Sequence, residues 1–176
     1  NKTWRFLPYS IASPAMNMAL DEAILIAHRR GHVPPTIRLY GWNPPALSLG
    51  YFQKAEREVD CQAVAAEKVE LVRRLTGGRA VLHDQEITYS VIVKLDHPQV
   101  PSSVSASHQW ISQGLTLALQ RLGLPIKTAK PQRTQSHASL ACFDAPSDYE
   151  IVLDGKKLVG SAQTRQQGIL LQHGSI

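Results

Sequence analysis

The first thirty residues show a spacing of apolar positions that is typical of an amphipathic helix. Ser13 followed by Pro14 suits an N-cap and a first helical position. Apolar residues then recur at steps of three and four and would form one buried face; they are Ala19, Leu20, Ala23, Ile24 and Ala27. Two arginines and Gly31 end the pattern. A helix over about residues 13–30 is therefore predicted.

A second helical pattern covers about residues 103–122. Its predicted apolar stripe consists of Val104, Ile111, Leu115, Ala118 and Leu122. Gly123 and Pro125 follow and would end the helix. A shorter helix is predicted over residues 60–67.

Short apolar runs bounded by Gly, Pro and Asn predict strands between and after these helices. They cover about residues 36–40, 46–50, 70–74, 79–82, 87–94, 149–153 and 158–162, with a last strand from about 169. Residues 127–141 are polar and match neither pattern, and the segment Asp154-Gly155-Lys156-Lys157 reads as a turn. Helices and strands mix without regular alternation, which predicts an α+β fold with a mixed, largely antiparallel sheet flanked by helices.

Length and hydropathy limit the classes that remain. The chain has 176 residues, which suits a single domain over residues 1–176 with a real core. No apolar run approaches the roughly 20 residues of a membrane helix, and the start lacks the apolar segment of a signal peptide. We therefore expect a cytoplasmic protein that does not bind a membrane. Because the chain lacks an initiating Met and stops at LLQHGSI, which resembles the inside of a strand, we also expect it to be truncated at its C-terminus.

The charge favours protein partners over nucleic acid. The net charge is +5 and the pI about 9.4, yet no run of five or six basic residues occurs. A basic face that speeds the encounter with an acidic protein explains this charge better than a nucleic-acid site.

The segment RRLTGGRAVLHDQEITYSV, residues 73–91, has the densest group of candidate site residues. Gly77 and Gly78 allow the backbone to approach a ligand closely, and the neighbouring arginines could meet a carboxylate, a phosphate or an acidic surface. Taken alone, a plain β-turn with solvated arginines explains the two glycines better. His83 lies next to Asp84, a pair that could act as a base, but this spacing alone does not assign that role.

The two cysteines, Cys61 and Cys142, call for different interpretations. They lie far apart, form no disulfide framework and belong to no C-x-x-C pair, so no metal site is predicted. Cys142 follows a loop and precedes a strand, where a thiol can be exposed and reactive. Cys61 begins an amphipathic helix, where packing is the expected role. A lysine of the later turn, Lys156 or Lys157, could lower the pKa of a nearby thiol and carry its proton.

Taken together, these segments resemble the lipoate-protein ligase and octanoyltransferase family, whose fold is shared with biotin protein ligases. The resemblance rests on NMALDEAIL, RRLTGGRAVLHD, CFDAPSDYEI and DGKKLVGSAQTRQQGILLQHGSI, which occur in the family's order over essentially the whole chain. Within the family, the sequence is similar to the octanoyltransferases that take octanoate from acyl carrier protein and load the glycine-cleavage H protein.

The resemblance implies roles for particular residues. CFDAPS matches the position of the family's nucleophile, which assigns that role to Cys142, and KLVGSA assigns the catalytic lysine to Lys157 rather than Lys156. The residues that would inherit acyl-binding roles are Arg74, Thr76, Gly77, Gly78 and His83. ATP-dependent ligases usually read Gly-Gly-Gly where this chain has Gly77-Gly78-Arg79, and they lack a matching cysteine. Both differences favour a transferase.

The activity that the resemblance implies is octanoyl transfer in lipoate biosynthesis. The acyl group would pass from acyl carrier protein through a Cys142 thioester to a lysine of a lipoyl-carrier protein such as the glycine-cleavage H protein. Because a thioester is converted into an amide, neither ATP nor another cofactor is required. Two alternatives stay open: an ATP-dependent lipoate-protein ligase, and a non-catalytic protein that binds lipoyl domains.

Overall fold

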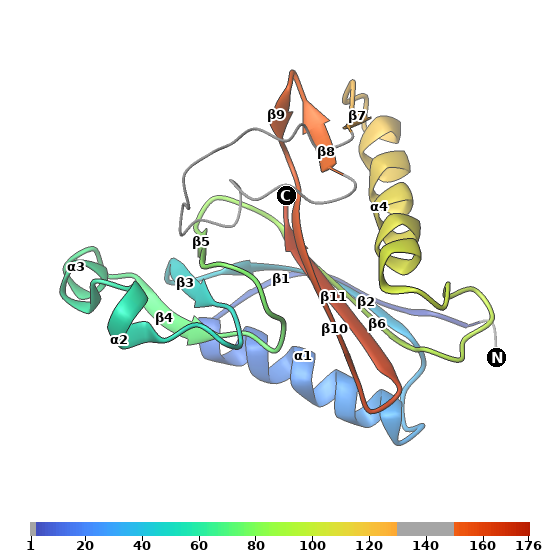
Figure 1. The fold of residues 1–176 in the computed structure, drawn as a ribbon, viewed down its shortest axis with the longest axis horizontal. Coiled ribbons are helices and arrows are strands. Elements are labelled where there is room, and N and C mark those ends of the chain that lie inside the picture. The colour runs from blue at the N-terminus through green and yellow to red at the C-terminus, as the bar shows by residue number, and fades with distance from the viewer. Residues whose placement is uncertain (1–2, 130–149) are drawn as a thin grey trace.

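A five-stranded mixed sheet forms the centre of the molecule (Figure 1). The computed structural model describes residues 3–129 and 150–176. The strands of this sheet are β1 (Arg5–Ala12), β2 (Thr36–Trp42), β6 (Thr88–Lys94), β10 (Gly160–Gln166) and β11 (Ile169–Ser175), in the order β1-β2-β6-β11-β10. The β1–β2 pair is parallel and the other pairs are antiparallel. The α+β fold with a mixed, largely antiparallel sheet is thus confirmed.

The two long helices, α1 (Pro14–Arg29) and α4 (Val104–Arg121), pack on opposite faces of this sheet. Side chains alternate along a strand, so β6 serves both faces. Val91 and Val93 share a core with Ile111 of α4, whereas Ile92 shares one with Ile24 of α1. Residues 91–93 of β6 are therefore apolar toward both faces, as expected for a sheet covered on each side.

Two smaller sheets extend from this centre. The first has the order β4-β3-β5 and is built from β3 (Ala46–Leu49), β4 (Glu70–Arg73) and β5 (Val81–His83), with the short helices α2 (Ala55–Glu58) and α3 (Cys61–Ala66) between β3 and β4. The second has the order β7-β8-β9 and contains β7 (Lys127–Ala129), β8 (Glu150–Leu153) and β9 (Lys156–Lys157). None of the helices in these described parts of the chain is long and apolar enough to cross a membrane.

Four elements of the described structure were not predicted: β1, α2, β7 and β9. β1 contains Pro8 and does not alternate, since it exposes Phe6, Tyr9 and Ile11 on an edge of the sheet. The four-residue turn prediction was also too long. Asp154 and Gly155 alone form the turn, with φ of 49° and 77°, and Lys156–Lys157 pairs with β8.

The predicted buried face of α1 is wrong. Ala19, Leu20 and Ala23 are exposed, and of the predicted set only Ile24 is fully buried. The helix instead turns a partly polar face to the sheet, which includes Asn17, Asp21 and His28 besides Ile24 and Leu25. Hydrophobic spacing cannot indicate this face, because partners from other strands satisfy its polar groups.

The predicted stripe of α4 is also partly wrong. Ile111 is buried, but Val104 and Leu122 are 58% and 78% exposed and Ala118 is exposed as well. The buried positions of this helix are Ser107, Ile111, Ser112 and Leu119. Ser107 is buried because its hydroxyl bonds to Gln163 and Arg165 of β10, so a small polar residue occupies a core-facing position.

Candidate active site

A pocket opens where the ends of β10 and β11 meet the smaller β4-β3-β5 sheet. Its wall combines apolar side chains with a few polar groups, as ligand sites commonly do. The apolar contributors are Met18, Tyr40, Trp42, Val81 and Ala162. The polar contributors are Ser48, Arg74, His83, Thr88, Ser161, His173 and Ser175, and Gly160 and Gly174 complete the lining.

The glycine turn that follows β4 packs tightly against the loop after β3. A Cβ on Gly50 would lie 2.0 Å from the carbonyl oxygen of Gly78, so the two backbones are in direct contact. Gly78 has φ of +95°, a conformation that other residues rarely adopt. Gly77 lies outside that region, and a Cβ there would make only ordinary contact with Phe52 at 4.0 Å. The two glycines therefore meet different structural demands.

Arg74 is buried beneath this turn, 4% exposed. Its Nε donates to Thr76 Oγ1 (3.2 Å), and its Nη1 to the carbonyl and the hydroxyl of Ser48 (2.8 and 3.2 Å). Its Nη2 donates to the carbonyls of Gly77 (2.9 Å) and Arg79 (2.6 Å). The interpretation of a solvated arginine in an ordinary turn is thus wrong for Arg74, because its N–H donors hold the turn together.

Arg73 is also engaged with the backbone. Its Nη1 donates to the carbonyls of Gly50, Tyr51 and Gln53 at 2.9, 3.1 and 2.7 Å. It therefore braces the loop after β3, which contains Gly50.

His83 is a buried residue whose acidic partner is not its sequence neighbour. Asp84 is exposed, whereas Nδ1 of His83 lies 3.2 Å from Glu86 Oε1. Nε2 lies 2.8 Å from Ser48 Oγ, and the ring stacks on Trp42 with a centroid distance of 4.2 Å. Burial lowers the pKa of His83, an effect that Glu86 only partly offsets.

Glu86 is held as a carboxylate by three donors. Burial raises its pKa, but hydrogen bonds from His83, Ser175 and Thr88 outweigh burial, so the pKa of Glu86 is lowered overall. Thr88 donates to it at 2.6 Å, and Ser175 donates to its second oxygen.

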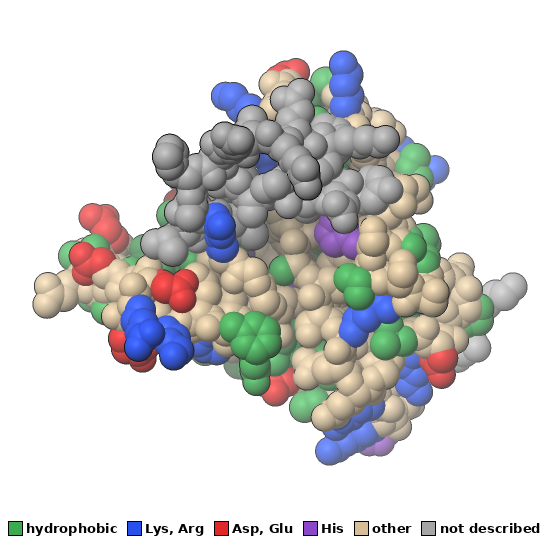
Figure 2. Space-filling model, in the orientation of Figure 1, with side chains coloured by type: hydrophobic (Ala, Val, Ile, Leu, Met, Phe, Trp, Pro, Cys, Tyr) green, Lys and Arg blue, Asp and Glu red, His purple; other side chains and the backbone are tan. Residues whose placement is uncertain are grey.

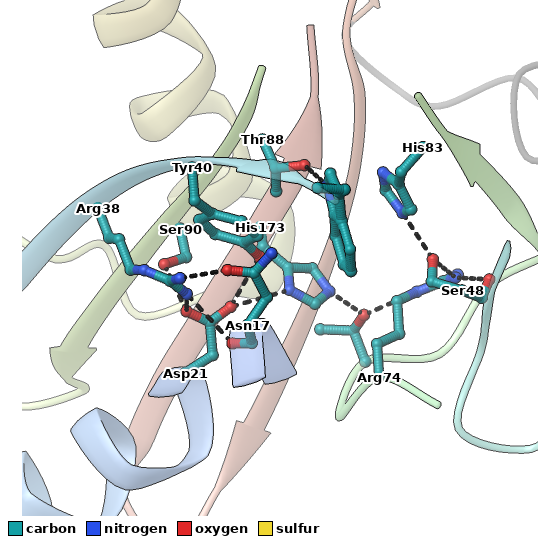
Figure 3. A network of polar contacts seen from close by, with 12 residues as sticks. Asn17, Asp21, Arg38, Tyr40, Ser48, Arg74, His83, Thr88, Ser90 and His173 are labelled. Atoms are coloured by element: carbon teal, nitrogen blue, oxygen red, sulfur yellow. Dashed lines mark hydrogen bonds and ion pairs between the residues drawn. The ribbon is translucent and has the colours of Figure 1, made fainter. Parts of the chain in front are cut away.

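A second carboxylate–histidine pair was not predicted from the sequence. Nε2 of His173 lies 2.6 Å from Thr76 Oγ1, and Nδ1 lies 3.5 Å from Asp21 Oδ2 (Figure 3). Asp21 also accepts hydrogen bonds from Arg38 Nη1 and from Tyr40 OH, each at 3.0 Å. Burial raises the pKa of Asp21, but His173 and Arg38 outweigh burial and lower it overall.

A faint signal for this second pair exists in the sequence. Asn17 and Asp21 lie four residues apart on α1 and therefore share one helix face. His173 lies within a strand that is otherwise mostly apolar or small, ILLQHGS. Polar residues on a helix face and on a strand that are both buried are expected to bond to each other. The spacing along the sequence alone does not identify which residues pair.

The structure brings together five of the seven predicted site residues: Arg74, Thr76, Gly77, Gly78 and His83 lie in and beside the pocket wall. Lys157 is half-buried in β9, and Lys156 is exposed. Cys142 lies outside the described residues. The packing role expected for Cys61 is wrong, because this thiol is free and exposed at the start of α3. That helix is only six residues long and buries none of its side chains.

Basic side chains do not gather around one point on the face of the described chain that Figure 2 shows. On the face seen in Figure 2, lysines and arginines are scattered among acidic and apolar groups. This distribution agrees with the absence of basic runs in the sequence.

Residues 13–176 match the family model of the lipoyl protein ligase A/B catalytic domain. The chain belongs to this family. The resemblance inferred from the sequence is thereby confirmed. Among curated relatives, the octanoyltransferase LipM of Kyrpidia tusciae is 57% identical to this chain. The match covers 99% of this chain and 66% of the relative. LipM of Bacillus subtilis is 51% identical over 99% of this chain and 65% of its own length. The chain thus spans just under two thirds of the length of these relatives.

Solved structures of the family share the fold of this catalytic domain. A lipoate-protein ligase A bound with ATP is 27% identical with a TM-score of 0.77, over 98% of this chain and 65% of that one. A protein of T. acidophilum with bound lipoic acid is 26% identical with a TM-score of 0.75, over 98% of this chain and 67% of that one.

Proposed function

We propose that the protein is an octanoyltransferase that moves octanoate from acyl carrier protein to a lysine of a lipoyl-carrier protein, such as the glycine-cleavage H protein. One observation carries the proposal: relatives named octanoyltransferase LipM are 49% to 57% identical over 98% to 99% of this chain. Since the chain spans about two thirds of their length, the activity is proposed for the protein to which this domain belongs.

The pocket supports an acyl substrate. Met18, Trp42 and Val81 give its wall an apolar surface, which an eight-carbon chain can cover with a gain of about 0.8 kcal/mol for each buried CH₂ group. Arg74 and His83 supply polar groups of the same wall, and Thr76 and the Gly77–Gly78 turn lie beside them through Arg74. In the proposal, the acyl tail lies along the apolar wall and the carbonyl end points toward the polar side.

The proposed chemistry uses Cys142 and Lys157. Lys157 takes the thiol proton, and the Cys142 thiolate attacks the thioester carbonyl of the donor. The C–S bond to the carrier breaks, and the carrier sulfur receives the proton from Lys157. The acceptor lysine then attacks the acyl-enzyme, an amide forms, and Lys157 returns the amine proton to the leaving Cys142 sulfur. Because a thiol nucleophile needs a reducing compartment, the proposal places the reaction in the cytoplasm.

An ATP-dependent lipoate-protein ligase is the second candidate, because a ligase A bound with ATP has the same fold at 27% identity. The two candidates differ in their donor. A transferase modifies the acceptor from an acyl carrier protein without ATP, whereas a ligase needs free lipoate or octanoate together with ATP.

The nucleophile can be tested by intact-mass analysis after mixing the full-length protein with octanoyl-acyl carrier protein. We expect one octanoyl adduct on the wild type and on Cys61→Ala, and none on Cys142→Ala, because only Cys142 is proposed to react. Cys61 is a suitable control since its thiol is exposed. An adduct that persists in Cys142→Ala would contradict the assignment of the nucleophile.

The two lysines of β9 provide a matched pair for the proton-transfer step. Neighbouring side chains of a strand point to opposite faces, and Lys157 is half-buried while Lys156 is exposed. Lys157→Ala should slow acylation by roughly 100-fold or more, the usual contribution of general acid–base catalysis, while Lys156→Ala should have little effect. Lys157→Arg should not restore the rate, because a guanidinium does not release its proton near neutral pH. Single-turnover acylation rates decide the question, and a slow Lys156→Ala would show that the assignment is reversed.

A further inference from the structure

Two chains of hydrogen bonds and ion pairs end on the same guanidinium beneath the glycine turn. Figure 3 shows Asp21 and His173 of one chain and His83 and Ser48 of the other around Arg74. We call Asp21, His173 and Thr76 the Asp21 relay, and Glu86, His83 and Ser48 the Glu86 relay. Each runs from a carboxylate, buried in Asp21 and half-buried in Glu86, through a histidine to a hydroxyl group, and both hydroxyl groups contact Arg74.

The two relays have the same order of contacts. In the Asp21 relay, carboxylate to Nδ1 is 3.5 Å, Nε2 to Thr76 Oγ1 is 2.6 Å, and Thr76 Oγ1 to Arg74 Nε is 3.2 Å. In the Glu86 relay, the corresponding distances are 3.2 Å, 2.8 Å and 3.2 Å, the last from Ser48 Oγ to Arg74 Nη1. The relays start on α1 and on the segment before β6, and their histidines lie on β11 and β5. They reach Arg74 through Thr76, which follows β4, and through Ser48 of β3.

The carboxylate at one end of each relay and the guanidinium at the other indicate how the hydrogens between them are arranged. An ionised carboxylate only accepts, so each histidine presents Nδ1–H to its carboxylate. The Arg74 guanidinium only donates, so each hydroxyl oxygen accepts from Arg74 and directs its own hydrogen to Nε2 of the histidine. An imidazole tautomer with its hydrogen on Nδ1 therefore gives every proton in the two relays an acceptor.

Arg74, which itself lines the pocket, passes this order on to the glycine turn. Its remaining Nη2 donors hold the carbonyls of Gly77 and Arg79 on either side of Gly78. A guanidinium is rigid and planar, so fixing its Nε and Nη1 edge also fixes the direction in which Nη2 points. The turn against the pocket is therefore oriented by groups on α1, β3 and β11.

We propose that the two relays are a positioning device for acyl transfer, which acts through Arg74 to hold the Gly77–Gly78 turn in place. The inference rests on the proposed function. Asp21, Glu86, His173 and Ser48 are then positioning residues that need not touch the acyl group. A turn displaced by about 1 Å can cost roughly 100-fold in rate without weakening substrate binding equally.

A double-mutant cycle on Ser48→Ala and Thr76→Val tests this convergence, with single-turnover acylation of the full-length protein by octanoyl-acyl carrier protein. Each single variant should lower the maximal rate by about tenfold to 100-fold while the donor KM changes by no more than about twofold. Because both act through one guanidinium, the double variant should be little slower than the slower single variant. Thr116→Val is the isosteric control, since that hydroxyl bonds to Ser112 within α4, and it should keep the wild-type rate.

Three results would overturn the proposal. Losses that multiply in the double variant would show that the relays act independently. A large rise in KM with an unchanged maximal rate would indicate direct substrate contacts. An equal loss in Thr116→Val would show that any removed hydroxyl slows the enzyme.

Imidazole nitrogen NMR separates this proposal from the proposed function, because it needs no acyl transfer. His83 and His173 should both show a protonated Nδ1 and an unprotonated Nε2 in the wild type. Ser48→Ala should shift the His83 signals and, through Arg74, those of His173. A His173 spectrum that Ser48→Ala leaves unchanged would refute the coupling even in an active enzyme. Expected shifts in a protein without transfer activity would support the coupling and refute only the octanoyltransferase.

Discussion

At the scale of single residues, burial and backbone conformation determine roles that residue type alone leaves open. Arg74 follows an equally basic neighbour, yet its guanidinium is buried and serves the backbone of the turn. Gly77 and Gly78 look equivalent in the sequence, but only Gly78 has a positive φ. The family motif therefore combines a glycine required for its conformation with one that is not.

This difference predicts unequal effects of alanine at the two glycines. Gly78→Ala should lower the free energy of unfolding by about 1–3 kcal/mol, because alanine resists that φ and its Cβ would lie 3.1 Å from Arg74 Nη2. Gly77→Ala should change it by less than about 1 kcal/mol, since its Cβ meets only Phe52 at 4.0 Å. Urea denaturation of both variants measures this. Equal losses would show that Gly77 is constrained as well.

At the scale of elements, α1 shows how a helix with a correct start and length can still be assigned the wrong face. Ser13 caps it, with its hydroxyl accepting from the Met16 N–H at 3.3 Å, as the sequence predicted. Its buried face, however, includes Asn17 and Asp21, which bond to Arg38 of β2. Apolar Leu20 lies at the surface instead.

The assignment of this face leads to a stability prediction. Ile24→Ala should cost about 2–5 kcal/mol, because Ile24 is 7% exposed and packs in the core beside Ile92. Leu20→Ala should cost less than about 1 kcal/mol, because Leu20 is 37% exposed. The apolar spacing predicts that both side chains are buried. Equal losses of stability in urea denaturation would therefore support the buried face predicted from the sequence.

At the scale of the whole molecule, the polar network brings residues from distant parts of the sequence together around one pocket. Asp21, Glu86 and His83 are all buried or largely buried, and each has a lowered pKa in the fold. The carboxylates are stabilised as anions by their donors, and burial keeps His83 neutral. All three groups therefore bind protons more readily when the chain is unfolded.

Stability should consequently decline as the pH falls. His83 contributes a loss that begins near its unfolded pKa of about 6.5, and the two carboxylates contribute further losses below about pH 4 as the pH approaches their folded values. Urea denaturation between about pH 7 and pH 4 should show the free energy of unfolding falling throughout. In His83→Asn the decline between about pH 6.5 and pH 5 should be reduced. A profile that rises toward acid pH would contradict the signs of these shifts.

The sequence by itself determined the α+β class, the family and the position of most long elements. These features depend on local signals: hydroxyl N-caps at Ser13 and Ser103, strongly apolar runs such as that of β6, and contiguous motifs around Gly77 and Lys157. The tertiary structure decided which polar groups meet. Thr76 and His173 are 97 residues apart, and His83 pairs with Glu86 rather than with adjacent Asp84. A buried polar side chain is stabilised by its partner and not by its own hydropathy, so its place follows only when distant strands and helices are brought together.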